Sequence, residues 1–440
     1  MDRDQRIRDP VHNLVKFTKG MLDDELLWDL IQTRPVQRLR RIKQLGFTDF
    51  VYPAAGHTRF SHSIGAMQMA RRMLDVLERN KVFKASRKDH QLWRRATQCA
   101  ALLHDVGHGP FSHVFEELSK SLGLSIDHED YTRELIRNGE IKKLLTKGHV
   151  LEKVGSFFEK EPGSFTYSAI VSSQLDADRL DFLARDRYFT GIEGERIDLE
   201  WLFDSLVIID VPIETGSPVK EYVFAIKAKG LAATENYLLA YANMYKAIYF
   251  HKTTRAVQFM ALDILKNIFG KPNRGKGIPK GNALRRYFDE APKPSLESFL
   301  NLDDDAVIEV IRAAAVGNLG EASALARRYL NRSLYKPWEL PRAPKGSVPQ
   351  VRFSKFLESL KGKHIFYHMD VVPVKQYKQF AAAGQFLKNI LVFSDYDREY
   401  KAIGHISEVI SERLPESPVR LYFKNAADRE RAKKLWGKAA

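Results

Sequence analysis

The chain has 440 residues, of which 44% are hydrophobic and 28% are charged. This length allows two or three domains and this apolar content supports a substantial core, so a disordered or fibrous protein is excluded. The formal charge of +15 favours anionic partners such as nucleotides or nucleic acid, although charge alone does not choose between them.

Cysteine usage and the chain start bear on the compartment. The single cysteine, Cys99, excludes an internal disulfide and a cysteine-rich zinc site, and it favours a reducing compartment. The first residues, Met1–Arg6, are charged, and no run reaches the roughly 18 apolar residues of a membrane span. We therefore expect a cytoplasmic protein with no membrane association.

The N-terminal third predicts a short extended element followed by helices. Residues 6–19 alternate around Pro10 and predict an extended arm or hairpin. Residues 23–45 then predict two helices separated at Pro35, the second strongly basic. A Gly/Pro loop at 53–57 leads into a further helix.

His62 is placed in the first turn of that helix if Thr58 or Ser61 is its N-cap. A neutral imidazole there is a good metal ligand, because the helix dipole disfavours its protonation. For His62 taken alone, a capping or core role remains open.

The most informative stretch is residues 100–113, with the sequence AALLHDVGHGPFSH. An apolar run that predicts a buried helix ends on His104 and Asp105, and a Gly/Pro turn then leads to His108 and His113. A buried imidazole beside a buried carboxylate costs several kcal/mol unless both are paired or bind a metal. The pattern therefore predicts a divalent metal at the end of this helix.

A second source of ligands is the helix predicted over residues 173–186. Its residues at i, i+3, i+4, i+7 and i+8 share one face, and they are Asp178, Asp181, Phe182, Arg185 and Asp186. Taken alone, this face could be a solvated, ion-paired surface. Beside a metal site it would supply a carboxylate ligand.

The rest of the chain predicts smaller units. Residues 206–227 predict a β-hairpin with a Gly-Ser-Pro turn, and residues 231–268 predict helices that carry aromatic and basic side chains, Tyr249 among them. Residues 271–282 and 336–349 predict loops. Strands are expected at 371–374, 389–393 and 419–423, and helices at 399–413 and 426–436.

We therefore expect a mainly α protein with a small β-hairpin insertion and a C-terminal α+β module. The expected units are a catalytic core over residues 1–270, a helical and linker region over 271–350, and the small α+β module over 351–440.

Imidazole and carboxylate ligands without thiolates suit one divalent ion, Mn, Fe, Zn, Ni or Mg. The candidate ligands are His62, His104, Asp105 and Asp178. Such an ion would keep positions open for a phosphate oxygen and water. The remaining polar groups nearby are candidates for acid–base catalysis or phosphate contacts: His108, His113, Glu116 and His128.

These residues carry a resemblance to a known family. The order His62, His104-Asp105, Asp178 resembles the signature of the HD-domain phosphohydrolase superfamily, whose core is an all-α helical bundle. Residues 59–65, 104–113 and 181–186 more narrowly resemble the dNTP triphosphohydrolases, in the branch that holds the eukaryotic SAM- and HD-domain enzyme and its bacterial relatives. Residues 9–12 and 37–46 fit that branch too, so the resemblance covers about residues 6–260.

The resemblance implies that the four candidate ligands bind the metal and that family enzymes split a dNTP into a deoxynucleoside and tripolyphosphate. It implies that Arg59 holds a phosphate, that His108, His113 and His128 line the phosphate channel, and that Gln44 and Asp186 face the sugar. Arg179 keeps a cation where the family has lysine, and we count Tyr249 with the substrate-binding residues. Glu116, Phe182 and Tyr241 depart from the family pattern, which leaves the exact substrate open.

Two other functions stay open at this stage. One is hydrolysis of another phosphate ester, such as a signalling nucleotide or single-stranded nucleic acid. The other is a nucleic-acid-binding protein with a vestigial metal site, which the charge favours.

The resemblance further implies a homo-oligomer, a dimer or tetramer, with a nucleotide effector at a subunit interface. The phosphate-facing cations of that interface would be Arg40, Lys227, Lys229 and Lys252. Gln32 replaces the carboxylate that would read guanine, so we expect any nucleotide activation not to be strictly guanine-specific.

Overall fold

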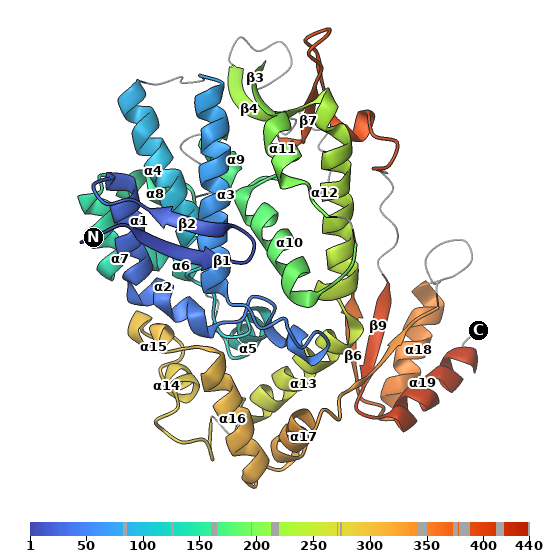
Figure 1. The fold of residues 1–440 in the computed structure, drawn as a ribbon. Helices are drawn as coiled ribbons and strands as arrows, with labels where there is room; N and C mark the ends of the chain where they lie inside the picture. The colour runs from blue at the N-terminus through green and yellow to red at the C-terminus, as the bar shows by residue number, and fades with distance from the viewer. Residues whose placement is uncertain are drawn as a thin grey trace.

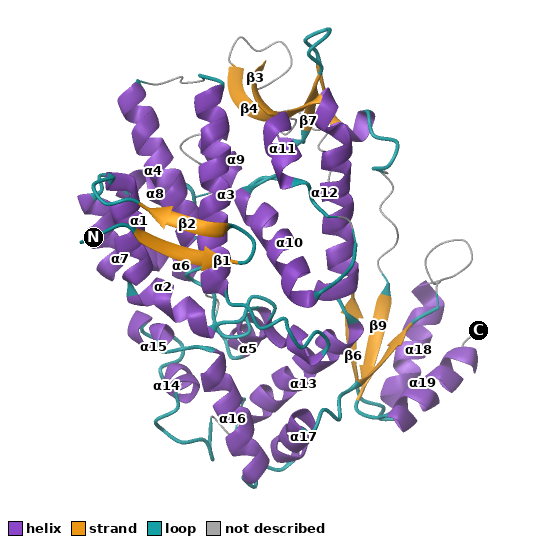
Figure 2. Cartoon of the chain, viewed as in Figure 1, coloured by secondary structure: helices purple, strands orange, loops and turns teal. Residues whose placement is uncertain are grey.

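Helices make up most of the described part of this chain, and the strands described there form three small sheets (Figure 2). The computed structural model describes residues 1–81, 86–124, 127–159, 165–194, 196–212, 220–270, 272, 275–341, 350–372, 377, 388–410 and 418–438. Within these residues the predicted mainly α fold is confirmed. None of the described helices combines the length and the apolar character that crossing a membrane requires.

The chain opens with the predicted hairpin, formed by β1 (Gln5–Asp9) and β2 (Asn13–Phe17). Its inner face buries Val15 and Phe17 completely, and the Phe17 ring lies 5.5 Å from the ring of Trp28. Trp28 belongs to α1 (Leu22–Gln32), which is followed by α2 (Arg34–Arg38) with Pro35 in its first turn. The hairpin is thereby docked on the helical core (Figure 1).

Three helices form the centre of the N-terminal half: α3 (Arg59–Arg79), α4 (Arg87–Leu103) and α10 (Ala177–Thr190). The helix α3 packs against both of the others. Gly65 permits the close approach of α10, because a Cβ at Gly65 would lie 1.9 Å from Oδ1 of Asp181. Shorter helices surround this centre: α5 (His113–Ser121), α6 (His128–Arg137), α7 (Gly139–Lys147), α8 (Leu151–Ser156), α9 (Phe165–Val171) and α11 (Leu199–Ser205).

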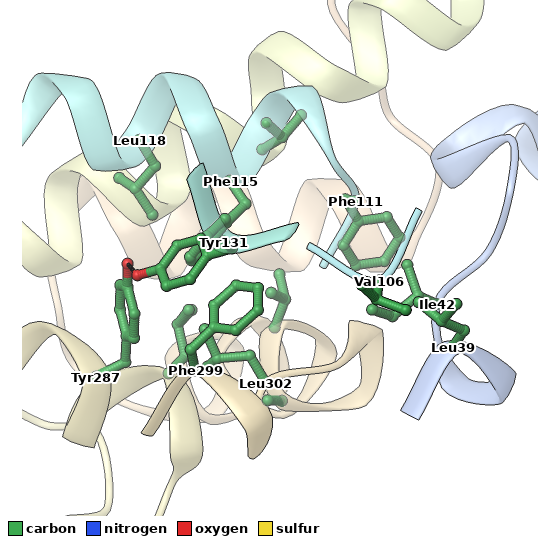
Figure 3. Close-up of a cluster of buried hydrophobic side chains, with 14 of the residues drawn as sticks. Leu39, Ile42, Val106, Phe111, Phe115, Leu118, Tyr131, Tyr287, Phe299 and Leu302 are labelled. Atoms are coloured by element: carbon green, nitrogen blue, oxygen red, sulfur yellow. Dashed lines mark hydrogen bonds between the residues drawn. The ribbon is translucent and has the colours of Figure 1, made fainter. Parts of the chain in front are cut away.

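The helical stretch expected over 231–268 is divided into α12 (Leu231–Met244), a π-helical turn η4 (Tyr245–Tyr249) and α13 (Lys252–Phe269). The next helices are α14 (Ala283–Asp289), α15 (Leu296–Leu300), α16 (Asp304–Val316) and α17 (Glu321–Leu330). These later helices share one apolar cluster with the N-terminal half (Figure 3). In it the ring of Tyr131 stacks on Phe299 at 3.6 Å, and its hydroxyl lies 2.7 Å from that of Tyr287.

The predicted second hairpin is present as β3 (Leu206–Pro212) and β4 (Lys220–Lys227); its Gly-Ser-Pro turn lies outside the described residues. Two strands from the C-terminal part complete this sheet, β7 (Leu391–Phe393), parallel to β4, and β8 (Tyr400–Ala402). The prediction of a helix over 399–413 is therefore wrong for the residues that the structure describes. Pairing with β7 makes 400–402 a strand, and a short 3-10 turn follows at Ile403–His405.

The third sheet has the strand order β5-β9-β6 and is covered by two helices (Figure 1). Its strands are β5 (Lys336–Glu339), β6 (Tyr367–Val371) and β9 (Val419–Phe423). The two helices are α18 (Gln350–Gly362) and α19 (Ala426–Lys438). A loop was expected at 336–349, but its first residues form β5, where Pro337 is tolerated because β5 is an edge strand. Residues 342–349 and 373–374 lie outside the described part, and the unit boundaries at 270 and 350 stay predictions.

Candidate metal centre and active site

The four predicted metal ligands come from three chain segments that meet where α3 contacts α4 and α10. His62 lies in the first turn of α3, and His104 and Asp105 directly follow α4. Asp176 caps α10 by accepting a hydrogen bond from the Arg179 amide, which puts Asp178 in the first turn of that helix. The helix packing therefore brings together ligands that lie far apart in the sequence.

The donor atoms of these side chains lie at distances suited to one ion. Nε2 of His62 is 3.2 Å from Nε2 of His104 and 3.0 Å from Oδ1 of Asp178. Oδ1 of Asp105 is 3.4 Å from Nε2 of His104. Ligands about 2.0–2.2 Å from a metal are separated from one another by roughly 3–3.5 Å. The donor atoms of His62, His104 and Asp105 all lie within 4.8 Å of one another, so these three residues form a candidate site for a single divalent cation. Asp178 is outside that group, but its Oδ1 lies beside both imidazoles.

Hydrogen bonds on the far side of each imidazole ring set the tautomer. Nδ1 of His62 donates to Oδ2 of Asp181 at 2.8 Å, and Nδ1 of His104 donates to the carbonyl oxygen of Ala101 at 2.8 Å. Both Nε2 atoms are then unprotonated in the neutral rings and face the same point. Such outer partners orient and strengthen metal-binding histidines.

The electrostatics of the cluster favour positive charge at that point. Burial lowers the pKa of His62, but hydrogen bonds to Asp178 and Asp181 outweigh burial and raise this pKa to about 10. Burial opposes ionisation of Asp105 as well, yet Arg59 and the neighbouring histidines hold its pKa well below the usual value. A divalent cation would compete with protons for the two imidazoles in this acidic pocket.

Asp181 supports this cluster, although the sequence marked it only as one member of a charged helix face. Its side chain is completely buried and also accepts from Nε2 of His12 at 2.6 Å and from Arg185 at 2.9 Å. Arg185 in turn donates to Oδ2 of Asp9 at 2.7 Å. The turn of the N-terminal hairpin thus holds the carboxylate that orients His62.

Arg59 lies beside the ligands and is almost fully buried. Its Nη1 donates to Oδ2 of Asp105 at 2.5 Å and its Nη2 to Oγ of Ser112 at 2.8 Å. Phe111 and Ser112 have φ angles of 49° and 43°, in the left-handed region that is strained for such residues. The Phe111 amide donates to Oδ1 of Asp304 at 2.8 Å, so α16 helps to hold this strained loop.

A second polar group adjoins the metal ligands. Glu116 accepts from Nδ1 of His128 at 2.7 Å, and its other oxygen lies 3.6 Å from Nδ1 of His113. The His128 ring stacks on His108 at 4.1 Å, and Nε2 of His108 is 3.2 Å from Oδ1 of Asp105. Burial opposes both charges, but their pairing raises the pKa of His128 and holds that of Glu116 below its usual value. These contacts form a chain of acid–base groups that leads to a metal ligand.

A cavity of about 290 Å³ opens beside Arg59. Its lining includes five of the predicted site residues: Gln44, Arg59, His113, Asp186 and Tyr249. The buried carboxylate of Asp186 accepts from the Tyr249 hydroxyl at 2.6 Å and lies 2.7 Å from Nε2 of His57, which sequence reasoning missed. Oε1 of Gln44 is buried and has no hydrogen-bond partner among the described residues, so it is available to a ligand.

Other predicted residues lie elsewhere. Arg179 is absent from the described lining; it pairs with Asp176, and its guanidinium lies 5.9 Å from the ring of Tyr241. The proposed effector contacts lie on five elements: α1, the 3-10 turn Leu39–Arg41, β4, the 3-10 turn Ala228–Gly230 and α13. These residues are Gln32, Arg40, Lys227, Lys229 and Lys252.

Comparison with known proteins places these features in a family. The HD-domain family matches residues 59–189, which hold all four candidate ligands. The uncharacterized protein YwfO of Bacillus subtilis is 34% identical over 340 residues, which are 76% of this chain and 72% of that protein. A crystal structure of a phosphohydrolase from Bacteroides thetaiotaomicron has a TM-score of 0.74 and 25% identity, over 96% of this chain and 100% of that one. The chain belongs to the HD-domain phosphohydrolase superfamily.

A more distant relative carries a named activity. The deoxynucleoside triphosphate triphosphohydrolase SAMHD1 homolog of Dictyostelium discoideum is 26% identical over 328 residues, which are 71% of this HD-domain chain and 57% of that protein. The chain likewise spans only 55–58% of several other curated relatives. The prediction of a metal-dependent phosphohydrolase is confirmed at the level of the superfamily.

The first prediction concerns the ligands of this HD-domain protein. Replacing both His104 and Asp105 by Ala removes two of the four donors, so we expect elemental analysis to find the divalent metal lost while circular dichroism shows an intact helical fold. His113→Ala is the control, because His113 is no ligand and this variant should keep its metal. Stoichiometric metal in a folded double variant would rule out the assignment.

The second prediction concerns the Glu116–His128 pair. Its stabilisation is fully present between about pH 4.5 and 6.5, the ordinary pKa values of the two groups, because Glu116 is lowered and His128 is raised. It is lost as the pH rises through the raised pKa of His128. The loss of unfolding free energy in Glu116→Gln, measured by denaturant titration, should therefore be larger at pH 6 than at pH 9. Glu117→Gln is the matched control on the same helix, and an equal loss at both pH values in Glu116→Gln would contradict the pairing.

Proposed function

We propose that this protein hydrolyses deoxynucleoside triphosphates to a deoxynucleoside and tripolyphosphate. The observation that carries the proposal is the continuity between the cavity and the metal ligands, since Arg59 lines the cavity and also bonds the ligand Asp105. The cavity volume of about 290 Å³ is near the lower end for small-molecule sites. The relationship to the Dictyostelium triphosphohydrolase supports the same substrate class.

His62, His104, Asp105 and Asp178 would hold the metal, which when bound supplies Lewis-acid polarisation of the substrate phosphate. Arg59 would bind a phosphate oxygen through guanidinium N–H groups, as its position beside Ser112 and His113 suggests. Gln44, Tyr249 and Asp186 would contact the sugar, with Asp186 held in place by His57. The positions of Arg59, Gln44, Tyr249 and Asp186 in the cavity wall support their roles.

In the proposed reaction, water attacks the α-phosphorus and the bond from phosphorus to the 5′-oxygen breaks. The water oxygen stays on the tripolyphosphate, and the 5′-oxygen of the deoxynucleoside takes a proton. We assign that proton to His113, because His113 lines the cavity whereas His128 is not among its lining residues. His128 and Glu116 would position His113, and the proton that water loses would regenerate it.

The convergence of intact donor groups speaks against a vestigial site. Outer hydrogen bonds to Asp181 and Ala101 orient the two imidazoles, which supports a metal-binding role. The charge of +15 is accounted for equally well by a substrate that carries a triphosphate.

The third prediction tests this function. The metal-loaded protein is incubated with dNTPs, NTPs and other nucleotides, and the products are separated by chromatography. We expect tripolyphosphate from dNTPs, and a fall in kcat of about 10²–10⁴ in His113→Ala at unchanged metal content, as is typical when a general acid is removed. Orthophosphate or pyrophosphate as the first product, or activity confined to another phosphate ester, would contradict the proposal.

A further inference from the structure

The third sheet, β5-β9-β6, is the C-terminal sheet of this chain. Two of its residues bond to residues that line the proposed catalytic cavity. Four lining residues lie in the segment from the end of η4 into α13: Phe250, Thr254, Arg255 and Gln258. Phe250 lies between the π-helical turn and α13, where the regular helix is interrupted. Its carbonyl oxygen accepts a hydrogen bond from Nη1 of Arg420 at 2.5 Å. Because Arg420 is on β9, the third sheet holds this break in the helix.

Arg255 is held by the same sheet. Its Nε donates to Oδ2 of Asp370 and its Nη2 to Oδ1 of Asp370, both at 2.9 Å. A bidentate pair of this kind fixes the plane of the guanidinium as well as its position. Asp370 lies on β6 and is buried. It stands directly opposite Arg420 in the register of β6 and β9. One cross-strand pair therefore holds two residues of the cavity wall.

The orientation of Gln258 follows from that of Arg255. Nη1 of Arg255 donates to Oε1 of Gln258 at 2.7 Å. The amide nitrogen of Gln258 is then the free end, and no described residue accepts a hydrogen bond from it. Gln258 therefore presents a neutral N–H donor in the cavity wall. Such a donor recognises a carbonyl oxygen or a ring nitrogen on a ligand.

This part of the wall suits the nucleobase, because its cation, Arg255, is already paired with the carboxylate of Asp370. Arg59, Ser112 and His113 form the cavity wall near the metal ligands. The α13 residues are joined by Tyr245, whose ring lies 5.9 Å from that of Phe250. Aromatic rings and one amide offer stacking and a single directional hydrogen bond, which is what reading a base requires.

We infer that the C-terminal sheet sets the base preference of the enzyme. Gln258 is the specificity-determining residue, which favours a base with an acceptor on the edge it meets, and Asp370 is a positioning residue that acts through Arg255. This inference rests on the proposed dNTP hydrolysis. It gives the C-terminal sheet a role in substrate choice that a purely structural module would not have.

The fourth prediction measures kcat/KM of the metal-loaded, full-length protein for dATP, dGTP, dCTP and dTTP. We expect Asp370→Asn and Gln258→Leu each to lower kcat/KM about ten-fold for the preferred dNTP and far less for the least preferred. The difference in kcat/KM between the best and the worst of the four substrates should therefore become smaller. Asp370→Glu should restore part of the difference in kcat/KM among the four dNTPs, because it keeps a carboxylate. Asp428→Asn is the matched control, since Asp428 pairs with Arg431 at 3.2 Å on α19, which packs on the same sheet, and neither residue lines the cavity; it should leave the four ratios unchanged.

Three results would overturn the inference: an equal fall for all four dNTPs in Asp370→Asn, unchanged ratios in Gln258→Leu, or a wild type that treats the four alike. Release of tripolyphosphate by the wild type is measured first, because it distinguishes a failure of the proposed function from a failure of the inference about base preference. Its absence contradicts the proposed function and the inference together, whereas its presence with uniform losses contradicts the inference alone.

Discussion

The buried carboxylate of Asp181 is the constraint on which the metal centre depends. It has no exposed surface, and a carboxylate there is stable only because His12, His62 and Arg185 all bond to it. These partners join the N-terminal hairpin, α3 and α10 at one point. Gly65 leaves the space that this junction needs, since any side chain there would displace Asp181. The position of His62 is therefore an outcome of the whole N-terminal packing.

The loop that follows His104 and Asp105 is held by residues from earlier and later parts of the chain. Arg38 is buried and donates to the carbonyl oxygens of Val106 and His108, at 2.9 and 2.7 Å. Asp304 accepts from the amides of Phe111 and of Lys43, the neighbour of Gln44, which ties two parts of the cavity wall to the start of α16. The start of α16 thus supports loops on both sides of the cavity wall.

Much of this arrangement could be predicted from the sequence because its chemistry is local. His62, His104 and Asp105 could be predicted as ligands because each lies at the end of a predicted helix. The helix period placed Asp178 and Asp181 on one face of another helix. The structure brings the four ligand types to one point, in line with that pattern. Periodicity could not show that Asp181 orients an imidazole and is not itself grouped with the ligands.

Other features depend on partners that no local pattern reveals. Arg38 and Asp304 act on backbone groups far away in the chain, so their residue types carried no signal. The segment from 400 to 402 has a helix-compatible composition, yet pairing with β7 makes it a strand. The contacts of Arg255 with Asp370, 115 residues apart, likewise exist only in the folded chain. Sequence reasoning found the candidate ligands and missed the residues that hold them in place.

The claim that water attacks the α-phosphorus at this metal centre is tested most directly with isotopically labelled water. The metal-loaded enzyme hydrolyses a dNTP in water enriched in oxygen-18, and mass spectrometry locates the label in the products. The account predicts one labelled oxygen in the tripolyphosphate and none in the deoxynucleoside, because the bond from phosphorus to the 5′-oxygen breaks. Label in the deoxynucleoside, or in orthophosphate or pyrophosphate released in its place, would contradict it.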